Sequence, residues 1–180
     1  MNNRKRGFSL VELLIVLAVI AALIATITPV AMNAIKKAKA TQVAQNLKTL
    51  ASALENAAYV NGINTDGTIK KSGTTTGSIA LADLGRDING EEYGVAYTMT
   101  TGGTVQAVIF AKVDADKAEV EKALNSVKEA TATGDDTISF TMPDSSTKTY
   151  ANLSVRPSGS TVSISSGTKL LYYSIEFTIY

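Results

Sequence analysis

The chain has 180 residues, a formal net charge of +1, 45% hydrophobic residues, and neither cysteine nor histidine. This length allows one membrane segment and one domain of ordinary size, and the balanced charge does not favour nucleic-acid binding. The composition excludes disulfides, thiol nucleophiles and histidine-assisted serine catalysis, so packing alone must hold the domain together.

The first thirty residues combine a short basic tip with a long apolar run. Residues 4–6 read Arg-Lys-Arg and precede Gly7, and the 23 residues from 8 to 30 are close to the ~20 that span a bilayer. The run contains one charged residue, Glu12. A carboxylate at the centre of a membrane helix costs about 2.5–3.5 kcal/mol, so Glu12 should have a partner or a function.

Two simpler interpretations of this segment explain less. A secretory signal has an apolar region of about 7–15 residues that ends at a small-residue cleavage site, and this run is longer and begins at the basic tip. A plain membrane anchor would take the same orientation, with its positive end inside. Neither kind of segment has a use for Glu12.

The segment resembles the prepilin leader of type IV pilins and of the pseudopilins of type II secretion. The resemblance rests on Arg4, Lys5, Arg6, Gly7, Phe8, Ser9, Leu10, Val11 and Glu12. It implies that a dedicated prepilin peptidase cuts after Gly7 and methylates the new amino group of Phe8. It also implies polymerisation through the N-terminal helix, with an assembly platform and a motor ATPase as partners.

The favoured interpretation is therefore a structural subunit of a type IV pilus. Its precursor would lie in the lipid of the inner (cytoplasmic) membrane, and the mature subunit would be a homopolymer in an extracellular filament. A type II secretion pseudopilin and a minor or adhesive pilin remain as alternatives, and motility, adhesion and DNA uptake are not distinguished. The favoured hypothesis is that Glu12 pairs with the Phe8 amine of a neighbouring subunit during assembly and fixes the axial register, a role that the resemblance also implies. The competing interpretation is that Glu12 pairs with the amine of its own chain at the helix N-terminus.

A helical pattern continues beyond the apolar run and predicts one helix from Phe8 to Val60. From Asn33 the pattern is amphipathic, and its apolar residues recur at spacings of three and four. These residues are Val43, Leu47, Leu50, Leu54 and Ala58. The helix is predicted to stop at Asn61-Gly62, because glycine suits the position after a helix end.

Pro29 lies within this helix and predicts a kink or an unwound turn there, since proline removes one hydrogen bond and clashes with the preceding turn. The hydroxyls of Thr26 and Thr28 could bond the carbonyls that proline leaves free. In the family that the segment resembles, the helix can be unwound at this point in filaments.

The remaining elements follow in order. Residues 61–78 are predicted to be a surface loop, 79–84 a short helical turn, and 93–100 and 104–113 a hairpin that turns at Gly102-Gly103. A charged helix is predicted at 114–130, with Asp116-x-x-Glu119 as its capping box and a buried stripe. The stripe comprises Val120, Ala123, Leu124 and Val127.

The last fifty residues predict strands at 137–142, 149–155, 161–165 and 170–179. The final strand alternates, and this predicts one face packed on the long helix and one face in water. The buried face would carry Tyr173, Ile175, Phe177 and Ile179, and the wet face Ser174, Glu176 and Thr178.

Together these elements predict an α+β fold. A long hydrophobic-then-amphipathic helix packs on an antiparallel sheet, with an extra short helix between strands. The predicted division is 1–7 leader, 8–30 transmembrane or filament-core segment, 31–61 amphipathic helix and 62–180 globular domain.

No catalytic centre, cofactor or metal site is predicted, and the chain is not expected to be an enzyme. The acids at 83–92, 114–116 and 135–136 are explained by helix caps and solvated loops. Asp114-x-Asp116 lacks the rest of a calcium-binding EF-hand loop. Tyr172 and Tyr180 are the candidates for exposed contact residues.

Overall fold

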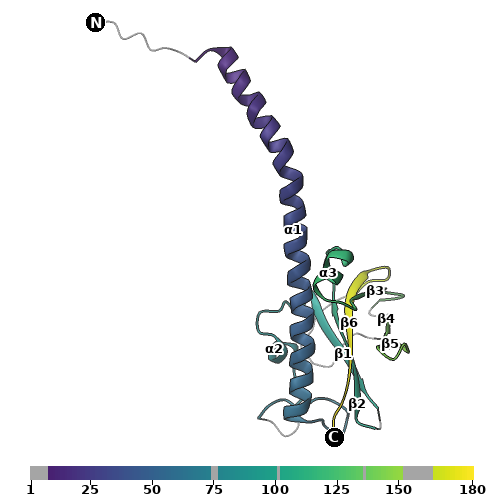
Figure 1. Cartoon of the computed structure of the whole chain (residues 1–180). Helices are drawn as coiled ribbons and strands as arrows, with labels where there is room; N and C mark the ends of the chain where they lie inside the picture. The colour runs from purple at the N-terminus through teal and green to yellow at the C-terminus, as the bar shows by residue number, and fades with distance from the viewer. Residues whose placement is uncertain (1–7, 74–76, 101, 136, 152–163) are drawn as a thin grey trace. The chain divides into compact units, whose positions relative to one another are not determined.

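The computed structural model describes residues 8–73, 77–100, 102–135, 137–151 and 164–180. It confirms the predicted α+β class (Figure 1). The elements are α1 (Leu10–Asn61), α2 (Leu81–Leu84), β1 (Tyr93–Met99), β2 (Thr104–Ala111), α3 (Lys117–Ala123), β3 (Lys128–Thr131), β4 (Thr137–Thr141), β5 (Thr147–Ala151) and β6 (Lys169–Thr178). The chain forms two compact units, Met1–Ala38 and Lys39–Tyr180.

Within the first unit, the described residues form the first part of α1. The helix begins at Leu10 and not at Phe8 as predicted, because Ser9 takes the position that precedes the first helical residue. From Leu10 to Ala38 the side chains are exposed on every face of the helix. This part of the helix has no apolar core of its own.

Within the second unit, the last part of α1 buries one apolar stripe, as predicted. Val43, Leu47, Leu50, Leu54 and Ala58 are each at most 1% exposed. The helix ends at Asn61, and Gly62 follows with a φ of +72°, donating its N–H to the Ala58 carbonyl at 3.1 Å. Only glycine adopts that left-handed backbone readily, which is why the helix stops where the sequence predicts.

The main sheet has the strand order β1-β2-β6-β3, and every pair in it is antiparallel. The predicted hairpin is confirmed as β1 and β2, with Tyr93 paired to Ala111 and Met99 to Val105. A second sheet consists of the β4–β5 hairpin.

The main sheet is covered on both of its faces. On one face, the Phe177 ring of β6 lies 5.8 Å from the Tyr59 ring of α1. On the other face, the Phe140 ring of β4 lies 5.9 Å from Phe110 of β2 and 4.9 Å from Tyr172 of β6. Figure 1 shows the sheet between α1 and the β4–β5 hairpin.

This arrangement corrects the prediction of one wet face for the last strand. Leu170, Leu171 and Tyr172 are successive residues and are all buried, since α1 covers one face here and the β4–β5 hairpin covers the other. The predicted alternation holds only further along the strand, where Glu176 is exposed and Phe177 is buried. Strand β2 is buried on both faces from Val105 to Ala111.

Close packing on the hairpin side depends on Gly94 of β1. The Phe110 ring lies over this residue, and a Cβ atom built at Gly94 would be 2.3 Å from Phe110 Cζ. Glycine is therefore required here by space rather than by backbone angle.

The predicted helix at 114–130 is too long. Helix α3 ends at Ala123, and Lys128–Thr131 is strand β3 on the edge of the main sheet. Ser126 has a φ of +74°, a left-handed conformation that a helix cannot contain. Of the predicted stripe, Val120, Leu124 and Val127 are buried, whereas Ala123 is exposed.

The cap of α3 forms in part as predicted. Asp116 is the N-cap residue, and its side chain accepts a hydrogen bond from the Ala118 N–H at 2.9 Å. The Glu119 carboxylate, predicted to bond back to the cap, instead accepts from Lys122 Nζ at 2.6 Å. Glutamate and lysine three residues apart lie on the same side of a helix, and this pairing competes with the capping box.

The predicted surface loop after α1 is partly a core element. Ile69 is fully buried, and its backbone N–H donates to the Tyr97 hydroxyl at 3.0 Å. Isolated bridges pair Ile63 with Ile69 and Lys70 with Ser78, in the parts of this segment that the structure describes. The following turn is confirmed as α2, with Leu81 and Leu84 buried.

Two predicted strands extend outside the described residues. The strand predicted at 149–155 is observed as β5, which ends at Ala151, and residues 152–155 lie outside. Of the strand predicted at 161–165, the structure describes only residues 164 and 165, and neither is in a strand.

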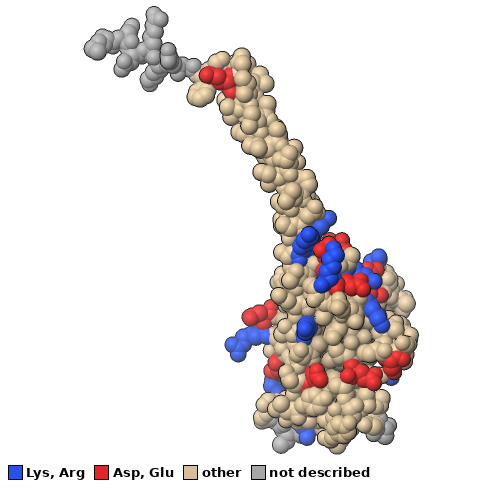
Figure 2. Space-filling view, in the orientation of Figure 1, with Lys and Arg blue, Asp and Glu red and all other residues tan. Residues whose placement is uncertain are grey.

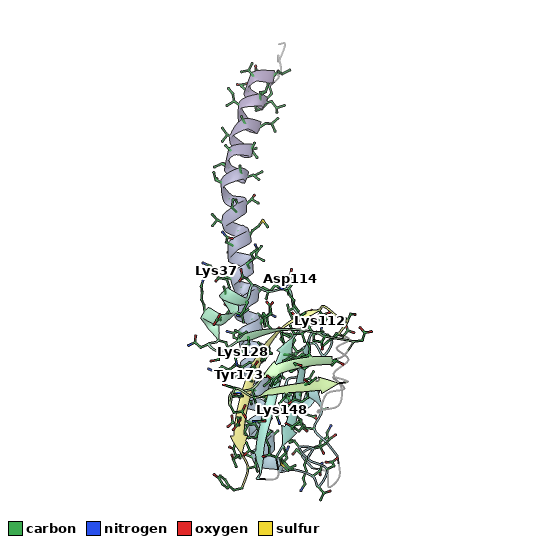
Figure 3. All side chains as sticks on the ribbon, turned by 90° about the vertical axis from the view of Figure 1, so that its right-hand side faces the viewer. Lys37, Lys112, Asp114, Lys128, Lys148 and Tyr173 are labelled. Carbon is green, nitrogen blue, oxygen red and sulfur yellow. The ribbon has the colours of Figure 1, made fainter. Side chains whose placement is uncertain are left out.

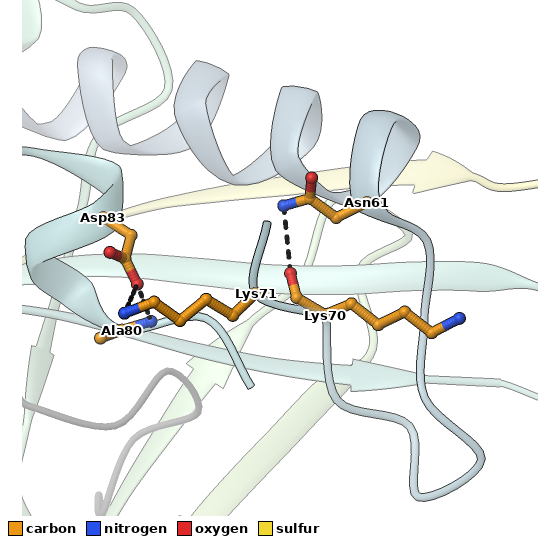
Figure 4. Close-up of polar contacts among 5 residues, drawn as sticks. All are labelled: Asn61, Lys70, Lys71, Ala80 and Asp83. Carbon is orange, nitrogen blue, oxygen red and sulfur yellow. Dashed lines mark hydrogen bonds and ion pairs between the residues drawn. The ribbon is translucent and has the colours of Figure 1, made fainter. Parts of the chain in front are cut away.

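The segment between α1 and α2 is fixed by polar contacts on both sides (Figure 4). Asn61 Nδ2 donates to the Lys70 carbonyl at 3.1 Å. The Asp83 carboxylate accepts from the Ala80 N–H at 2.9 Å and pairs with Lys71 Nζ at 3.3 Å. These contacts hold the pKa of Asp83 below its ordinary value of 3.8, the Ala80 hydrogen bond being the largest cause.

The lowered pKa predicts a loss of stability in acid. A depressed pKa in the folded state stabilises the fold above the unfolded value, and the contribution disappears as the pH falls below about 4 through the folded value. We expect Asp83→Asn to remove this part of the pH dependence of the unfolding midpoint, measured by circular dichroism. Asp87→Asn, at a nearby exposed acid, should keep the wild-type curve, and an unchanged curve for Asp83→Asn would contradict the assignment.

Candidate functional site

The N-terminal end of α1 holds the only predicted functional carboxylate. Glu12 Oε2 accepts a hydrogen bond from the Ser9 backbone N–H at 2.9 Å, and the Ser9 carbonyl accepts from the Leu13 N–H at 3.2 Å. Ser9 thus precedes the helix, and Glu12 is its third helical residue. A carboxylate at this position is stabilised by the N–H groups and the dipole of the helix end.

Sequence reasoning missed this contact, although its signal is present. Ser9-Leu10-Val11-Glu12 has the S-x-x-E form of a capping box. The contact turns the Glu12 carboxylate toward the start of the chain. The Ser9 nitrogen is three covalent bonds from the Phe8 nitrogen, so the carboxylate already points to where a free amine would arise by cleavage before Phe8. That position suits pairing with the amine of its own chain as well as pairing with the amine of a neighbouring subunit.

Of the other predicted processing residues, the structure describes Phe8. Gly7 and the basic residues 4–6 lie outside the described residues. Phe8 is 84% exposed and precedes the helix. Cleavage after Gly7 and methylation at Phe8 therefore stay predictions.

The surface of α1 after Glu12 is apolar all round. No Lys, Arg, Asp or Glu occurs between Glu12 and Lys36, and Figure 2 shows the corresponding uncharged stretch of the helix. Its large side chains are about half exposed or more, from 46% at Ile20 to 69% at Val30. By length and composition this helix could cross a membrane. So much apolar surface needs lipid or other copies of the helix around it.

Pro29 lies inside α1, which is helical on both sides of it. The Thr26 hydroxyl donates to the Leu23 carbonyl at 2.9 Å, and the Thr28 hydroxyl donates to the Ile24 carbonyl at 2.8 Å. Proline lacks the N–H that would bond the Ala25 carbonyl, so these hydroxyls bond neighbouring carbonyls rather than the freed one. The prediction of direct compensation is wrong, and the turn is not unwound in this structure.

The acids of the globular unit have structural contacts. Asp83 and Asp116 bond backbone N–H groups at the starts of α2 and α3, and Asp135 Oδ1 accepts from the Ser166 N–H at 3.1 Å. Asp136 lies outside the described residues. In the described part of the chain, no three His, Cys, Asp or Glu residues come together in a way that could hold a metal ion.

The two candidate contact tyrosines differ in their exposure. Tyr180 is fully exposed, as predicted. Tyr172 is only 3% exposed, and its hydroxyl accepts from the Thr141 N–H at 3.0 Å, so its prediction as a surface residue is wrong. Its neighbour Tyr173 is half-buried on the other face of β6 (Figure 3).

Comparison with known protein families gives a match in the N-terminal segment. Residues 2–28 match the family described as prokaryotic N-terminal methylation motif. No curated protein and no solved structure was found to match the chain. The matched range contains the basic tip, Gly7, Phe8, Glu12 and most of the exposed apolar run. The chain therefore carries a prokaryotic N-terminal methylation motif at residues 2–28, which supports a prepilin similar to those of type IV pilins and pseudopilins.

Proposed function

We propose that this protein is a structural subunit of a type IV pilus. The prepilin peptidase cuts after Gly7 and methylates Phe8, and the mature subunit polymerises through the apolar part of α1. The observation that carries the proposal is the uncharged helix between Glu12 and Lys36, which is exposed on every face and holds the Glu12 carboxylate at its amino end. Such a surface suits a bilayer first and a bundle of identical helices afterwards.

The leader determines the order of events. Before cleavage, the positive residues 4–6 keep the amino end at the cytoplasmic surface, and the globular unit lies outside. Cleavage removes these three charges and creates one amine on Phe8. In the low dielectric of a helix bundle, this amine and the carboxylate of a neighbouring Glu12 attract strongly and offset each other's desolvation. The assembly platform and motor ATPase supply the mechanical work of extraction.

The proposed role is structural rather than enzymatic. The chain lacks histidine and cysteine, and the acids of its globular unit have the capping contacts described above. A type II secretion pseudopilin is the alternative with the same N-terminal chemistry.

The intact mass of the protein in filaments sheared from cells tests the proposal. We expect a chain that begins at Phe8 and is heavier by one methyl group, and abundant recovery would identify a major rather than a minor subunit. Gly7→Leu should leave a chain that begins at Met1 and stays with the membrane. Recovery of the methylated chain only from the cell envelope would favour the pseudopilin alternative, and an uncut wild-type chain would refute both.

A further inference from the structure

A cleft lies between the end of α1, the segment that follows it and helix α2. Its volume is about 510 Å³, within the range of sites that hold small molecules. All of its lining residues belong to the second compact unit. Its polar lining comprises Asn61, Lys71, Ser72, Asp83 and Arg86.

The walls of the cleft are fastened to one another by contacts within the chain (Figure 4). Asn61 Nδ2 joins α1 to the Lys70 carbonyl at 3.1 Å, and Lys71 Nζ joins the same segment to the Asp83 carboxylate of α2 at 3.3 Å. The Lys70 N–H also donates to the Gly62 carbonyl at 3.0 Å, just after the end of α1. A site that is already fixed loses little conformational entropy when a ligand binds.

Arg86 adds a cation that has no partner in the described part of the chain. Its side chain is exposed, and its guanidinium takes part in none of the ion pairs or hydrogen bonds among these residues. Arg86 follows α2 directly, in a turn that the Ile88 N–H closes on the Gly85 carbonyl at 3.3 Å. Because Lys71 and Asp83 neutralise each other, the lining keeps one surplus positive charge.

The surplus charge favours a carboxylate as the anionic group of a ligand. The planar guanidinium of Arg86 donates two parallel hydrogen bonds to a carboxylate, a geometry that a lysine amine does not reproduce. A phosphate group carries nearly two charges at neutral pH and would need a second free cation. Lys71 does not supply that cation, because its amine is paired with Asp83.

The rest of the lining suits a ligand with several hydroxyl groups. The Asp83 carboxylate and the Asn61 amide oxygen accept hydrogen bonds from hydroxyls, and the Ser72 hydroxyl both donates and accepts. The apolar side chains of Ile79 and Leu84 also line the cleft, but they are only 3% and 5% exposed. This apolar surface is small, so it fits the C–H groups of a sugar ring better than a fatty chain.

We propose that this cleft binds an acidic saccharide, a sugar ring that carries a carboxylate. Arg86 pairs with the carboxylate, and Asn61 and Asp83 bond hydroxyls of the ring. The activity goes beyond the structural role proposed above and does not require filament assembly. A free acidic sugar and a unit of an acidic polysaccharide present the same groups to the cleft.

Methyl NMR on the isoleucine-labelled full chain in detergent tests the site. Sodium glucuronate is expected to shift the Ile79 resonance saturably, with a dissociation constant of about 1 mM for a ligand of this size. The resonance of Ile138, which is fully buried in β4, should not move. Glucose, which lacks the carboxylate, should bind roughly tenfold more weakly or less.

Two probes separate the sources of the sugar. Hexagalacturonate that binds at least tenfold more tightly than sodium galacturonate would identify a polysaccharide chain as the ligand. Equal affinity for the hexamer and the monomer would identify the free sugar.

Three variants relate the binding to Arg86. Arg86→Gln removes the surplus charge and no contact of the fold, so it should weaken glucuronate binding roughly tenfold or more at an unchanged unfolding midpoint. Arg86→Lys keeps the charge without the planar fork and should fall between Arg86→Gln and the wild type. Lys117→Gln removes an exposed cation on α3 and should bind glucuronate like the wild type.

Four results would overturn the proposal. They are no saturable shift of the Ile79 resonance, an equal shift with glucose, unchanged glucuronate binding by folded Arg86→Gln, and equal binding of sodium acetate, which has a carboxylate but no sugar ring. None of these measurements uses filaments, so their failure is distinguishable from a failure of the proposed pilus function.

Discussion

Glu12→Gln is expected to reduce the subunit recovered in sheared filaments by at least tenfold, while membrane insertion and cleavage after Gly7 continue. Removing one partner of a buried ion pair costs about 3–5 kcal/mol, and each 1.4 kcal/mol is a factor of ten in an equilibrium. The measurement is the ratio of sheared to membrane-bound subunit by quantitative immunoblot.

The cap observed at the start of α1 makes this substitution informative. Glutamine keeps the shape of glutamate and can still accept the Ser9 N–H, so Glu12→Gln removes the charge and leaves the cap. Glu12→Ala removes both. Glu55→Gln makes the same chemical change elsewhere on α1 and should assemble normally. If Glu12→Gln assembles like the wild type and only Glu12→Ala fails, Glu12 acts as a cap and not as the partner of an amine.

Phe140→Ala is expected to lower the free energy of unfolding by about 3–5 kcal/mol, the usual cost of deleting a buried aromatic ring. Phe140 is fully buried, and its ring lies 5.9 Å from the rings of Phe110 and Tyr150 and 4.9 Å from that of Tyr172. It is the centre of the aromatic cluster that attaches the β4–β5 hairpin to the main sheet. Chemical denaturation followed by circular dichroism measures the change.

Two further variants calibrate this result. Phe140→Leu leaves a smaller cavity and should cost clearly less than Phe140→Ala. Tyr180→Ala changes a fully exposed aromatic residue and should stay within about 0.5 kcal/mol of the wild type. A loss below about 1 kcal/mol for Phe140→Ala would mean that the hairpin contributes little to the stability of the fold.

The parts of the fold that were predicted correctly depend on local patterns. The stripe from Val43 to Ala58 repeats at helical spacing, and Gly62 ends the helix for a local backbone reason. The β1–β2 hairpin likewise follows from two apolar runs around a glycine turn. Each of these signals lies within one short continuous stretch of the chain.

The errors occur where distant segments decide the outcome. Tyr172 was predicted to be a surface residue, but the β4–β5 hairpin covers it. Residues 128–131 were predicted to be helical, but they form a strand that pairs with β6. Ile69 lies in a polar segment but is drawn into the core beside Tyr97. Single-sequence patterns contain no record of such pairings, because the partners lie roughly 30 or more residues away.

The sequence shows that Glu12 is an unusual acid, and it predicts that Gly7 and Phe8 flank a cleavage point. It did not predict the geometry around Glu12. The hydrogen bond from Ser9 required the start of the helix to be placed at Leu10. If the helix started two residues earlier, at Phe8 as predicted, the Glu12 carboxylate would not act as a cap and would reach only toward solvent or a partner.

The position of β6 between β2 and β3 determines when this molecule can fold. The last ten-residue strand of the chain fills an interior place in the sheet, and until it arrives β2 has a neighbour on one edge only. In the proposed orientation the amino end stays at the cytoplasmic surface, and this carboxyl-terminal strand is the last element to cross the membrane. The subunit must therefore remain open until export is almost complete, with an apolar strand edge available for wrong pairings. In this proposed order, the domain is most prone to wrong strand pairing after its helix is anchored in the membrane and before its last residues have crossed it.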